Sequence, residues 1–210
     1  MWKRSACLYR VRTHERAIAL TIDDGPTSET PEILRVLRDN HAHATFFLIS
    51  THVTGRESIV NEIVADGHEL GNHMTRDEPS IRLKPEEFDA AAREAGSVLQ
   101  QFASVRWLRP GSGWYTPRMV TSIERAGYRC ALGSIYPFDA QLPSSAFASA
   151  YIRANARPGA VIVLHDGRSR GHRTAMTLQR VLPSLRAHGY RVVSLSELEL
   201  LASETSRGAR

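Results

Sequence analysis

The stretch Ala17-Ile18-Ala19-Leu20-Thr21-Ile22-Asp23-Asp24-Gly25-Pro26-Thr27 changes abruptly from apolar to polar and turn-forming residues. Its first part, Ala17–Ile22, is mostly apolar over the length of one strand, which is typical of a β-strand buried on both faces. The Asp-Asp-Gly-Pro segment that follows is typical of a turn. The stretch therefore predicts a central strand of a parallel sheet that ends in two carboxylates.

The rest of the chain alternates between segments with strand and helix patterns. Gly67, Gly127 and Gly189 each stand between a predicted helix and a predicted strand, where glycine supplies the left-handed conformation that ends a helix. Such αβ connections predict an α/β fold, and about seven of these units in one domain favour a closed or nearly closed barrel of parallel strands. The predicted strands are Ala17–Ile22, Ala44–Ile49, His68–Gly71, Val105–Leu108, Tyr128–Leu132, Ala160–Leu164 and Arg191–Leu195, and the predicted helices are Pro31–Asn40, 59–64, Pro85–Gln101, Pro117–Ala126, Ser145–Ala156 and 178–185.

The length and composition predict one globular domain. The chain has 210 residues, of which 42% are hydrophobic and 23% charged; this is the ordinary balance of a globular protein. We divide it into an N-terminal lead-in (1–16), a single domain (17–202) and a flexible tail (203–210). No apolar run approaches the roughly 20 residues of a membrane span. The basic N-terminus lacks the apolar core of a signal peptide, so the protein is either intracellular or has lost a leader.

The net charge of +5 comes almost entirely from arginine, since Lys3 and Lys84 are the only lysines. A basic surface suits an anionic polymer such as a cell-wall glycan, whereas no basic run interleaved with aromatic residues indicates nucleic-acid binding. The two cysteines, Cys7 and Cys130, are far apart in the sequence. We expect a reduced Cys130 within a strand; a Cys7–Cys130 disulfide would require an oxidising compartment.

Polar residues follow the predicted strands one after another. In strand order these are Asp23 and Asp24, then His73 with Asp77, then Arg109, Asp139 and His165. In barrels of parallel strands, the carboxyl ends of the strands meet at one face, where function collects. Carboxylates and imidazoles that converge from different strands predict a hydrolytic metal site.

Several of these segments resemble the motifs of the polysaccharide deacetylases, the NodB homology domain of carbohydrate esterase family 4. Residues 21–27 resemble the first motif, 71–73 the start of the second, 109–113 the third and 164–166 the fifth. Residues 44–47 also resemble the second strand of that family. The order and spacing agree from about Ala17 to Leu198. The resemblance implies a distorted (β/α) barrel and a metal-dependent enzyme that removes acetyl groups from the amide nitrogens of a poly- or oligosaccharide.

The resemblance also implies a role for each matching residue. Asp23 would be the general base, Arg109 would hold it in place, and Asp24 and His73 would be metal ligands. His165 would be the general acid that protonates the leaving amine, oriented by Asp139. The remaining residues would contact the substrate: the backbone N–H of Ser112 as oxyanion donor and Leu164 as a wall of the acetyl pocket. A metal-activated water, a base and an acid from separate strands are what amide hydrolysis needs.

The second motif departs from the family pattern, in which two histidines stand four positions apart. Here the second position is Asp77. Either Asp77 is the third ligand of a divalent metal, which we favour because the spacing is kept, or it is a surface residue and the metal is weak or absent. Two carboxylates would make the metal a weaker Lewis acid. Harder oxygen ligands also favour manganese, cobalt or iron over zinc, so we expect zinc not to be the best activator.

The fourth motif keeps Asp139 but has Ala140 where the family has a tryptophan. Ala140 is too small to form a wall of the acetyl pocket, and Trp114 or Tyr115 is a candidate for that role. The altered motifs leave two further functions open. One is a catalytically silent relative that binds glycan, and the other is an O-acetyl esterase. Retention of Asp23, Arg109 and His165 argues against the silent relative, since a protein that only binds glycan has no need of an acid–base pair.

Overall fold

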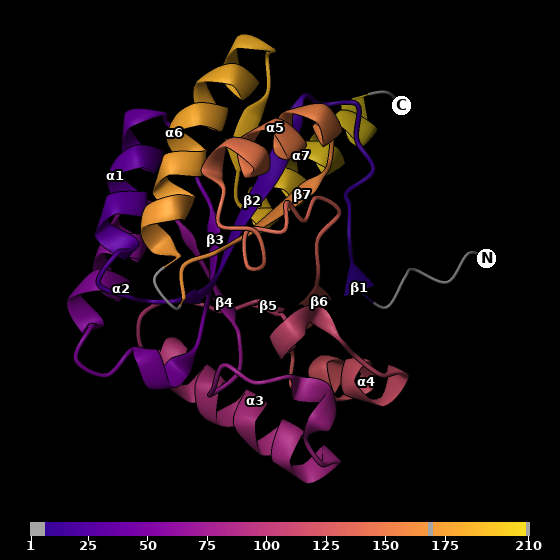
Figure 1. Ribbon diagram of the computed structural model, residues 1–210. Coiled ribbons are helices and arrows are strands. Elements are labelled where there is room, and N and C mark those ends of the chain that lie inside the picture. Colours follow the sequence, from indigo (N-terminus) through magenta and orange to yellow (C-terminus); the bar gives the residue numbers. More distant parts are fainter. Residues whose placement is uncertain (1–6, 168–169, 209–210) are drawn as a thin grey trace.

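The computed structural model describes residues 7–167 and 170–208, and its strands form one sheet of parallel pairs. The strand order is β1-β6-β5-β4-β3-β2-β7, and β8 also pairs with β2 (Figure 1). The α/β fold class with parallel strands is therefore confirmed. The strands of the described residues are β1 Cys7–Leu8, β2 Ala17–Gly25, β3 Thr45–Leu48, β4 Glu69–Asn72, β5 Trp107–Leu108, β6 Arg129–Ala131, β7 Val161–His165 and β8 Arg191–Val193.

Helices connect the strands and surround the sheet (Figure 1). Their predicted positions agree with the structure to within a few residues for α1 to α5, while α6 extends well beyond the predicted stripe at 178–185. The helices of the described residues are α1 Thr30–Asp39, α2 Glu57–Ala65, α3 Pro85–Leu99, α4 Pro117–Arg125, α5 Ser145–Asn155, α6 Gly171–Ala187 and α7 Leu195–Gly208. Among the described residues, no helix has the length and apolar character needed to cross a membrane.

β2 is the centre of the sheet, and every one of its residues is buried. It pairs with β3 on one side, and on the other with β8 at Ala17–Ala19 and with β7 at Ala19–Asp23. Alternate residues of β2 belong to two separate apolar clusters: Ile18 packs in the larger one and Ala17 in a smaller one that includes Leu195 and Leu198 of α7. Both faces of β2 are thus covered, which explains its nearly continuous apolar run.

The two edges of the sheet approach each other through isolated bridges. β1 and β7 are the edge strands of the path. Arg10, just after β1, forms an antiparallel bridge with Ala160, and Ile135, just after β6, forms a parallel bridge with Ile162 of β7. This arrangement is consistent with the predicted distorted barrel.

The N-terminal region contains a strand that we did not predict. Cys7 and Leu8 form β1, which pairs in parallel with β6 so that Cys7 and Cys130 are register partners. The two cysteines form a disulfide with a Cα–Cα distance of 4.7 Å. The expectation of a reduced Cys130 was therefore wrong, because Cys7 and Leu8 of the lead-in join the sheet beside the strand that carries Cys130.

The C-terminal region is helical where we expected a tail. α7 continues to Gly208, whereas the flexible tail was predicted from residue 203. Leu195, Leu198 and Ala202 are buried at helical spacing, and this apolar stripe holds the helix against the sheet. Residues 209–210 lie outside the described residues.

Candidate functional site

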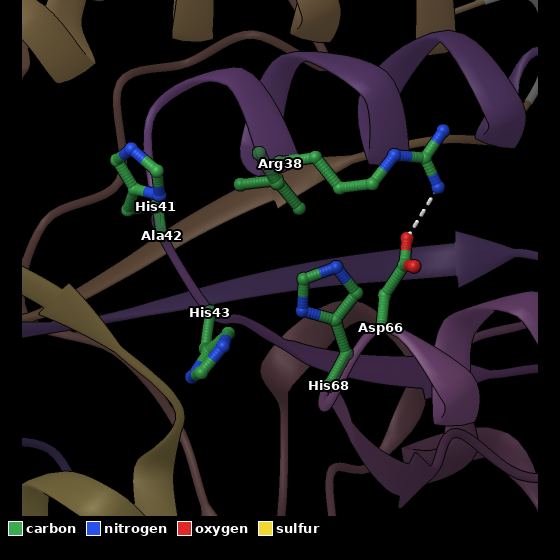
Figure 2. Close-up of a pocket in the computed structure, with 7 residues that line it drawn as sticks. Arg38, His41, Ala42, His43, Asp66 and His68 are labelled. Carbon is green, nitrogen blue, oxygen red and sulfur yellow. Dashed lines mark hydrogen bonds and ion pairs between the residues drawn. The ribbon is translucent and has the colours of Figure 1, made fainter.

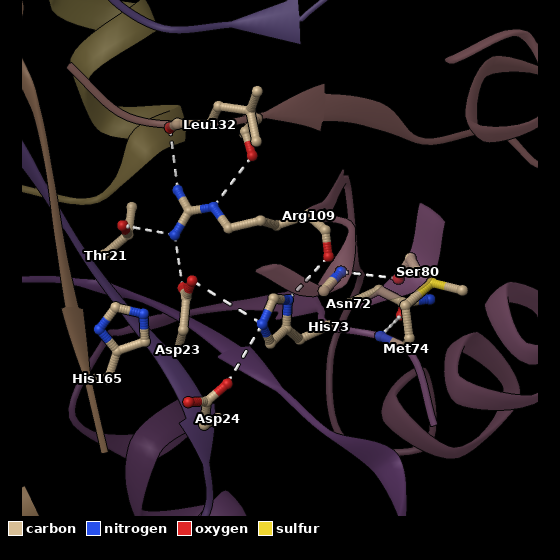
Figure 3. A network of polar contacts seen from close by, with 12 residues as sticks. Thr21, Asp23, Asp24, Asn72, His73, Met74, Ser80, Arg109, Leu132 and His165 are labelled. Carbon is tan, nitrogen blue, oxygen red and sulfur yellow. Dashed lines mark hydrogen bonds and ion pairs between the residues drawn. The ribbon is translucent and has the colours of Figure 1, made fainter. Parts of the chain in front are cut away.

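Most of the predicted site residues lie together at the carboxyl ends of the strands (Figure 3). Asp23 and Asp24 are near the end of β2, and His165 is the last residue of β7. Asp23 and His165 are register partners on these neighbouring strands, so their side chains stand on the same face of the sheet. Figure 3 shows Asp23 between His165 and His73.

Asp23 is held by a buried arginine. Arg109 Nη1 donates to Asp23 Oδ1 over 2.5 Å, and both side chains are almost wholly buried. The guanidinium also donates to Thr21 Oγ1 and to the backbone oxygens of Ala131 and Leu132, at 2.8 to 3.0 Å. It lies 4.1 Å from the centre of the Phe47 ring. These contacts fix Arg109, and Arg109 in turn fixes the carboxylate of Asp23.

Asp24 and His73 face each other beside this pair. Asp24 Oδ1 lies 3.3 Å from His73 Nε2, and Asp23 Oδ2 lies 3.9 Å from the same nitrogen. On the other side of the ring, His73 Nδ1 donates to the backbone oxygen of Arg109 over 2.8 Å. A histidine oriented by such a bond presents Nε2 as a ligand. Asp24 and His73 therefore fit as two ligands of one divalent cation.

The electrostatics of these two side chains are coupled. Burial opposes the charged form of Asp24, but its hydrogen bond to His73 and the charges of His73, His165 and Arg170 lower the pKa of Asp24 to about 2. Burial likewise opposes a charge on His73, but Asp23 and Asp24 outweigh it and raise the pKa of His73. Each of the two side chains thus stabilises the charged form of the other.

The third predicted ligand does not join them. Asp77 is exposed, and residues 75–78 form bends rather than a helical turn. The four-residue spacing from His73 therefore does not place the two side chains on one face, as it would in a helix. Across residues 7–167 and 170–208, no group of three or more His, Cys, Asp or Glu side chains has the geometry to hold a metal ion.

His165, the predicted general acid, pairs with Asp139. Asp139 Oδ2 accepts a hydrogen bond from the backbone N–H of His165 at 2.9 Å, and both of its carboxylate oxygens lie 3.1 Å from His165 Nδ1. Burial opposes a charge on the ring, but the hydrogen bond to Asp139 and the charges of Asp139, Asp23 and Asp24 raise the pKa of His165. Asp139 therefore orients the ring and favours its protonated form, as a general acid requires.

The three predicted substrate contacts have different surroundings. Ser112 is exposed in the turn η3 (Gly111–Gly113) with a positive φ of 63°, and Trp114 just after it is 68% exposed. Leu164, which we expected to line the acetyl pocket, is instead completely buried in the large apolar cluster. Side chains alternate along a strand, so Val163 and not Leu164 shares the face of β7 that carries His165.

Two further charged residues near the site were given no role from the sequence. Arg170 Nη1 donates to Asp24 Oδ2 over 3.2 Å. Asp166 is buried and accepts hydrogen bonds from the hydroxyls of Thr27 and Thr30, at 2.8 and 2.5 Å, and its burial raises its pKa. Asp166 follows a predicted buried strand together with His165, but we assigned it no role of its own from the sequence. Arg170 does not directly follow a predicted strand.

A separate cavity of about 330 Å³ lies at the amino ends of β3 and β4, opposite the strand ends that carry the site (Figure 2). It is lined by Arg38, His41, His43, Asp66 and His68, among others. The rings of His43 and His68 meet edge to face at 5.8 Å. None of the predicted site residues lines this cavity.

Comparison with known proteins identifies the class to which this fold and site belong. The polysaccharide deacetylase family model matches residues 10–131, which is more than half of the chain, so the protein belongs to the polysaccharide deacetylase family. A peptidoglycan-N-acetylglucosamine deacetylase of Bacillus cereus is 31% identical over 194 residues, which are 90% of this chain and 91% of the relative. A chitooligosaccharide deacetylase of a Bradyrhizobium strain is 31% identical over 87% of this chain and 90% of its own.

A solved structure from the same family bears on activity. It is a mutant, with restored enzymatic activity, of BA3943, a carbohydrate esterase family 4 pseudoenzyme from Bacillus anthracis. The similarity has a TM-score of 0.83 and 25% identity over 91% of this chain and 70% of the other. Enzymes and pseudoenzymes therefore share this fold, and the site must be judged residue by residue.

Proposed function

We propose that the protein is a metal-dependent hydrolase that removes acetyl groups from the amide nitrogens of N-acetylated sugars in a poly- or oligosaccharide. The observation that carries the proposal is the pairing of Asp23 and His165 in register on adjacent strands, each with its own orienting partner. Both named relatives support an N-acetylated glycan as the substrate class.

The residues of this chain can perform both proton transfers of amide hydrolysis. Asp23, held by Arg109, takes a proton from the attacking water, and the water oxygen forms a bond to the acetyl carbon. The protonated His165 then gives its proton to the sugar nitrogen as the carbon–nitrogen bond breaks, which leaves acetate and a free amine. The Ser112 backbone N–H is our candidate donor to the oxyanion, a contribution of on the order of 3 kcal/mol in comparable sites.

Asp24 and His73 would hold the metal. A divalent cation there supplies Lewis-acid polarisation of the amide and a lower pKa for the attacking water. Asp77 as a third ligand, and with it the preference for manganese, cobalt or iron over zinc, stays a prediction.

The exposure of Asp77 also favours a second candidate function. A site with two protein ligands binds a cation less tightly than one with three, and a relative with a weakly held metal would bind glycan without cleaving it. Retention of both proton-transfer groups favours the enzyme, since a protein that only binds glycan needs neither.

The test is acetate release from an N-acetylated chito-oligomer and from an acetylated xylan, each with and without a chelator. We expect release from the chito-oligomer that the chelator stops and that Asp23→Asn abolishes. Asp39→Asn is the matched control, because Asp39 is an exposed carboxylate paired with Arg35 on α1. Release from xylan alone would indicate the O-acetyl esterase, and binding without release from either substrate would indicate the silent relative.

A further inference from the structure

A row of aromatic rings leads away from His165 along the protein surface. The Tyr136 ring meets the His165 ring edge to face at 5.7 Å, and the Phe138 ring meets Tyr136 at 5.6 Å. Tyr151 lies 5.7 Å beyond Phe138, and Phe147 lies 6.1 Å beyond Tyr151. We call Tyr136, Phe138, Tyr151 and Phe147 the aromatic strip. It starts at the proposed general acid, on the loop between β6 and α5, and ends on α5.

The outer rings of the strip are too exposed to be part of the core. Phe138 and Phe147 are each 42% exposed, and Leu142 between them in the sequence is 46% exposed. Single exposed apolar side chains are ordinary, but a contiguous group of them marks a surface that binds something. Burial in the fold therefore does not explain why these positions are aromatic.

The backbone at Phe138 gives a second, independent indication. Its φ of 58° is in the left-handed region, which costs a bulky residue of the order of 1–2 kcal/mol and glycine nothing. The loop holds this conformation because the backbone N–H groups of Gln141 and Leu142 donate to the Phe138 oxygen at 3.0 and 2.7 Å. The Tyr136 hydroxyl also hydrogen-bonds the Gln141 side chain. Glycine would meet the needs of the loop, so the phenyl ring itself is the feature that requires an explanation.

We propose that the aromatic strip binds the sugar rings of a glycan chain that extend beyond the residue being deacetylated. This inference rests on the proposed function, because the strip begins at His165, where the reacting sugar would lie. Sugar rings have apolar C–H faces that stack on aromatic side chains, and their hydroxyl groups stay in water. The positive φ at residue 138 allows Asp139 to face His165 while Phe138 faces outward, so one loop would position the acid and bind the substrate chain.

The test measures binding separately from turnover. Dissociation constants for N-acetylated chito-oligomers of increasing length are measured by calorimetry in the Asp23→Asn protein, with and without Phe138→Ala. We expect Phe138→Ala to weaken binding of the longer oligomers by about tenfold, which is the loss typical of one stacked ring. The loss should grow with chain length. Leu200→Ala is the matched control, since Leu200 is an exposed apolar residue on α7, and we expect no effect from it.

A second substitution distinguishes the ring from the loop. Phe138→Gly removes the ring but permits the observed φ, so it should weaken binding as much as Phe138→Ala does. If the Phe138→Gly protein binds the longer oligomers as tightly as the protein with Phe138, the geometry of the loop, and not stacking on the ring, determines binding. An equal loss for all chain lengths, or no loss, would overturn the inference. Length-dependent binding without acetate release from the unaltered protein would sink the proposed function and leave the aromatic strip standing.

Discussion

The buried pair of Arg109 and Asp23 allows a quantitative prediction about stability. Replacement of Arg109 with methionine keeps the length and apolar stem of the side chain but removes the charge and its hydrogen bonds. The Asp23 carboxylate then stays buried without its cation, and the backbone oxygens of Ala131 and Leu132 lose their donors. Breaking a buried ion pair on one side costs about 3–5 kcal/mol. With a urea dependence of about 2 kcal/mol per molar, the unfolding midpoint should fall by roughly 1.5–2.5 M.

The effect of the pair itself is isolated by a double-mutant cycle. Asp23→Asn in the Arg109→Met protein removes the carboxylate that lost its partner, so the double variant should be more stable than the sum of the single effects predicts, by about 2–3 kcal/mol. Urea unfolding followed by circular dichroism measures all four proteins. Arg35→Met, which removes an exposed ion pair with Asp39, serves as the control and should have no measurable effect. A loss below about 1 kcal/mol for Arg109→Met, or strict additivity, would refute this reasoning.

Three further predictions concern other parts of the molecule. The Cys7–Cys130 disulfide spans 123 residues, so its replacement by two serines should lower the free energy of unfolding by about 4–5 kcal/mol; a reductant should destabilise the unaltered protein equally and the serine variant not at all. Burial lowers the pKa of His68 to about 4 from 6.5, so the unfolded chain binds the extra proton. The contribution of His68 to the free energy of unfolding should therefore be fully present above pH 6.5, and about 3 kcal/mol of it should be lost as the pH falls toward 4. His68→Gln should remove this part of the pH dependence. Unfolding curves measured across that pH range would show or contradict it. His73→Ala should abolish metal binding measured by titration calorimetry, while Asp77→Ala decides whether that residue is the third ligand: an affinity loss of tenfold or more means that it is, and an unchanged affinity means that it is not.

The sequence predicted the core of the sheet because each buried strand is a short apolar run that ends in a polar residue. β2 shows this most clearly, since Ala17–Ile22 is buried and the carboxylates follow at once. β1 was missed because two residues, Cys7 and Leu8, carry no periodic pattern. α7 was not predicted, because its apolar stripe is sparse beyond Leu198 and ends at Ala202. Elements with few apolar residues form because they pack against other parts of the fold, and the local sequence does not reveal which parts those are.

The same distinction holds for the candidate site. Asp23, Arg109, His73 and His165 follow strands, so the direction of the strands alone brings them to one face. The contact of Arg170 with Asp24 depends on the path of the loop after β7, which no local pattern describes. Leu164 was expected at the acetyl pocket from the resemblance alone, which does not take account of how side chains alternate along β7. Asp77 was named as a ligand because its spacing from His73 matches the family pattern, and that spacing does not reveal the bends at residues 75–78.

The register between β2 and β7 has a consequence for how this protein can change. Asp23 and His165 are direct partners across that pair of strands. Backbone hydrogen bonds therefore set the distance between their Cα atoms near the interstrand spacing of about 4.8 Å. The connecting segments that follow β5 and β6, by contrast, carry exposed side chains such as Trp114 and Phe138. Those segments can lengthen, shorten or exchange side chains while Asp23 and His165 keep their places. New substrates are therefore accessible to this scaffold without any redesign of its chemistry.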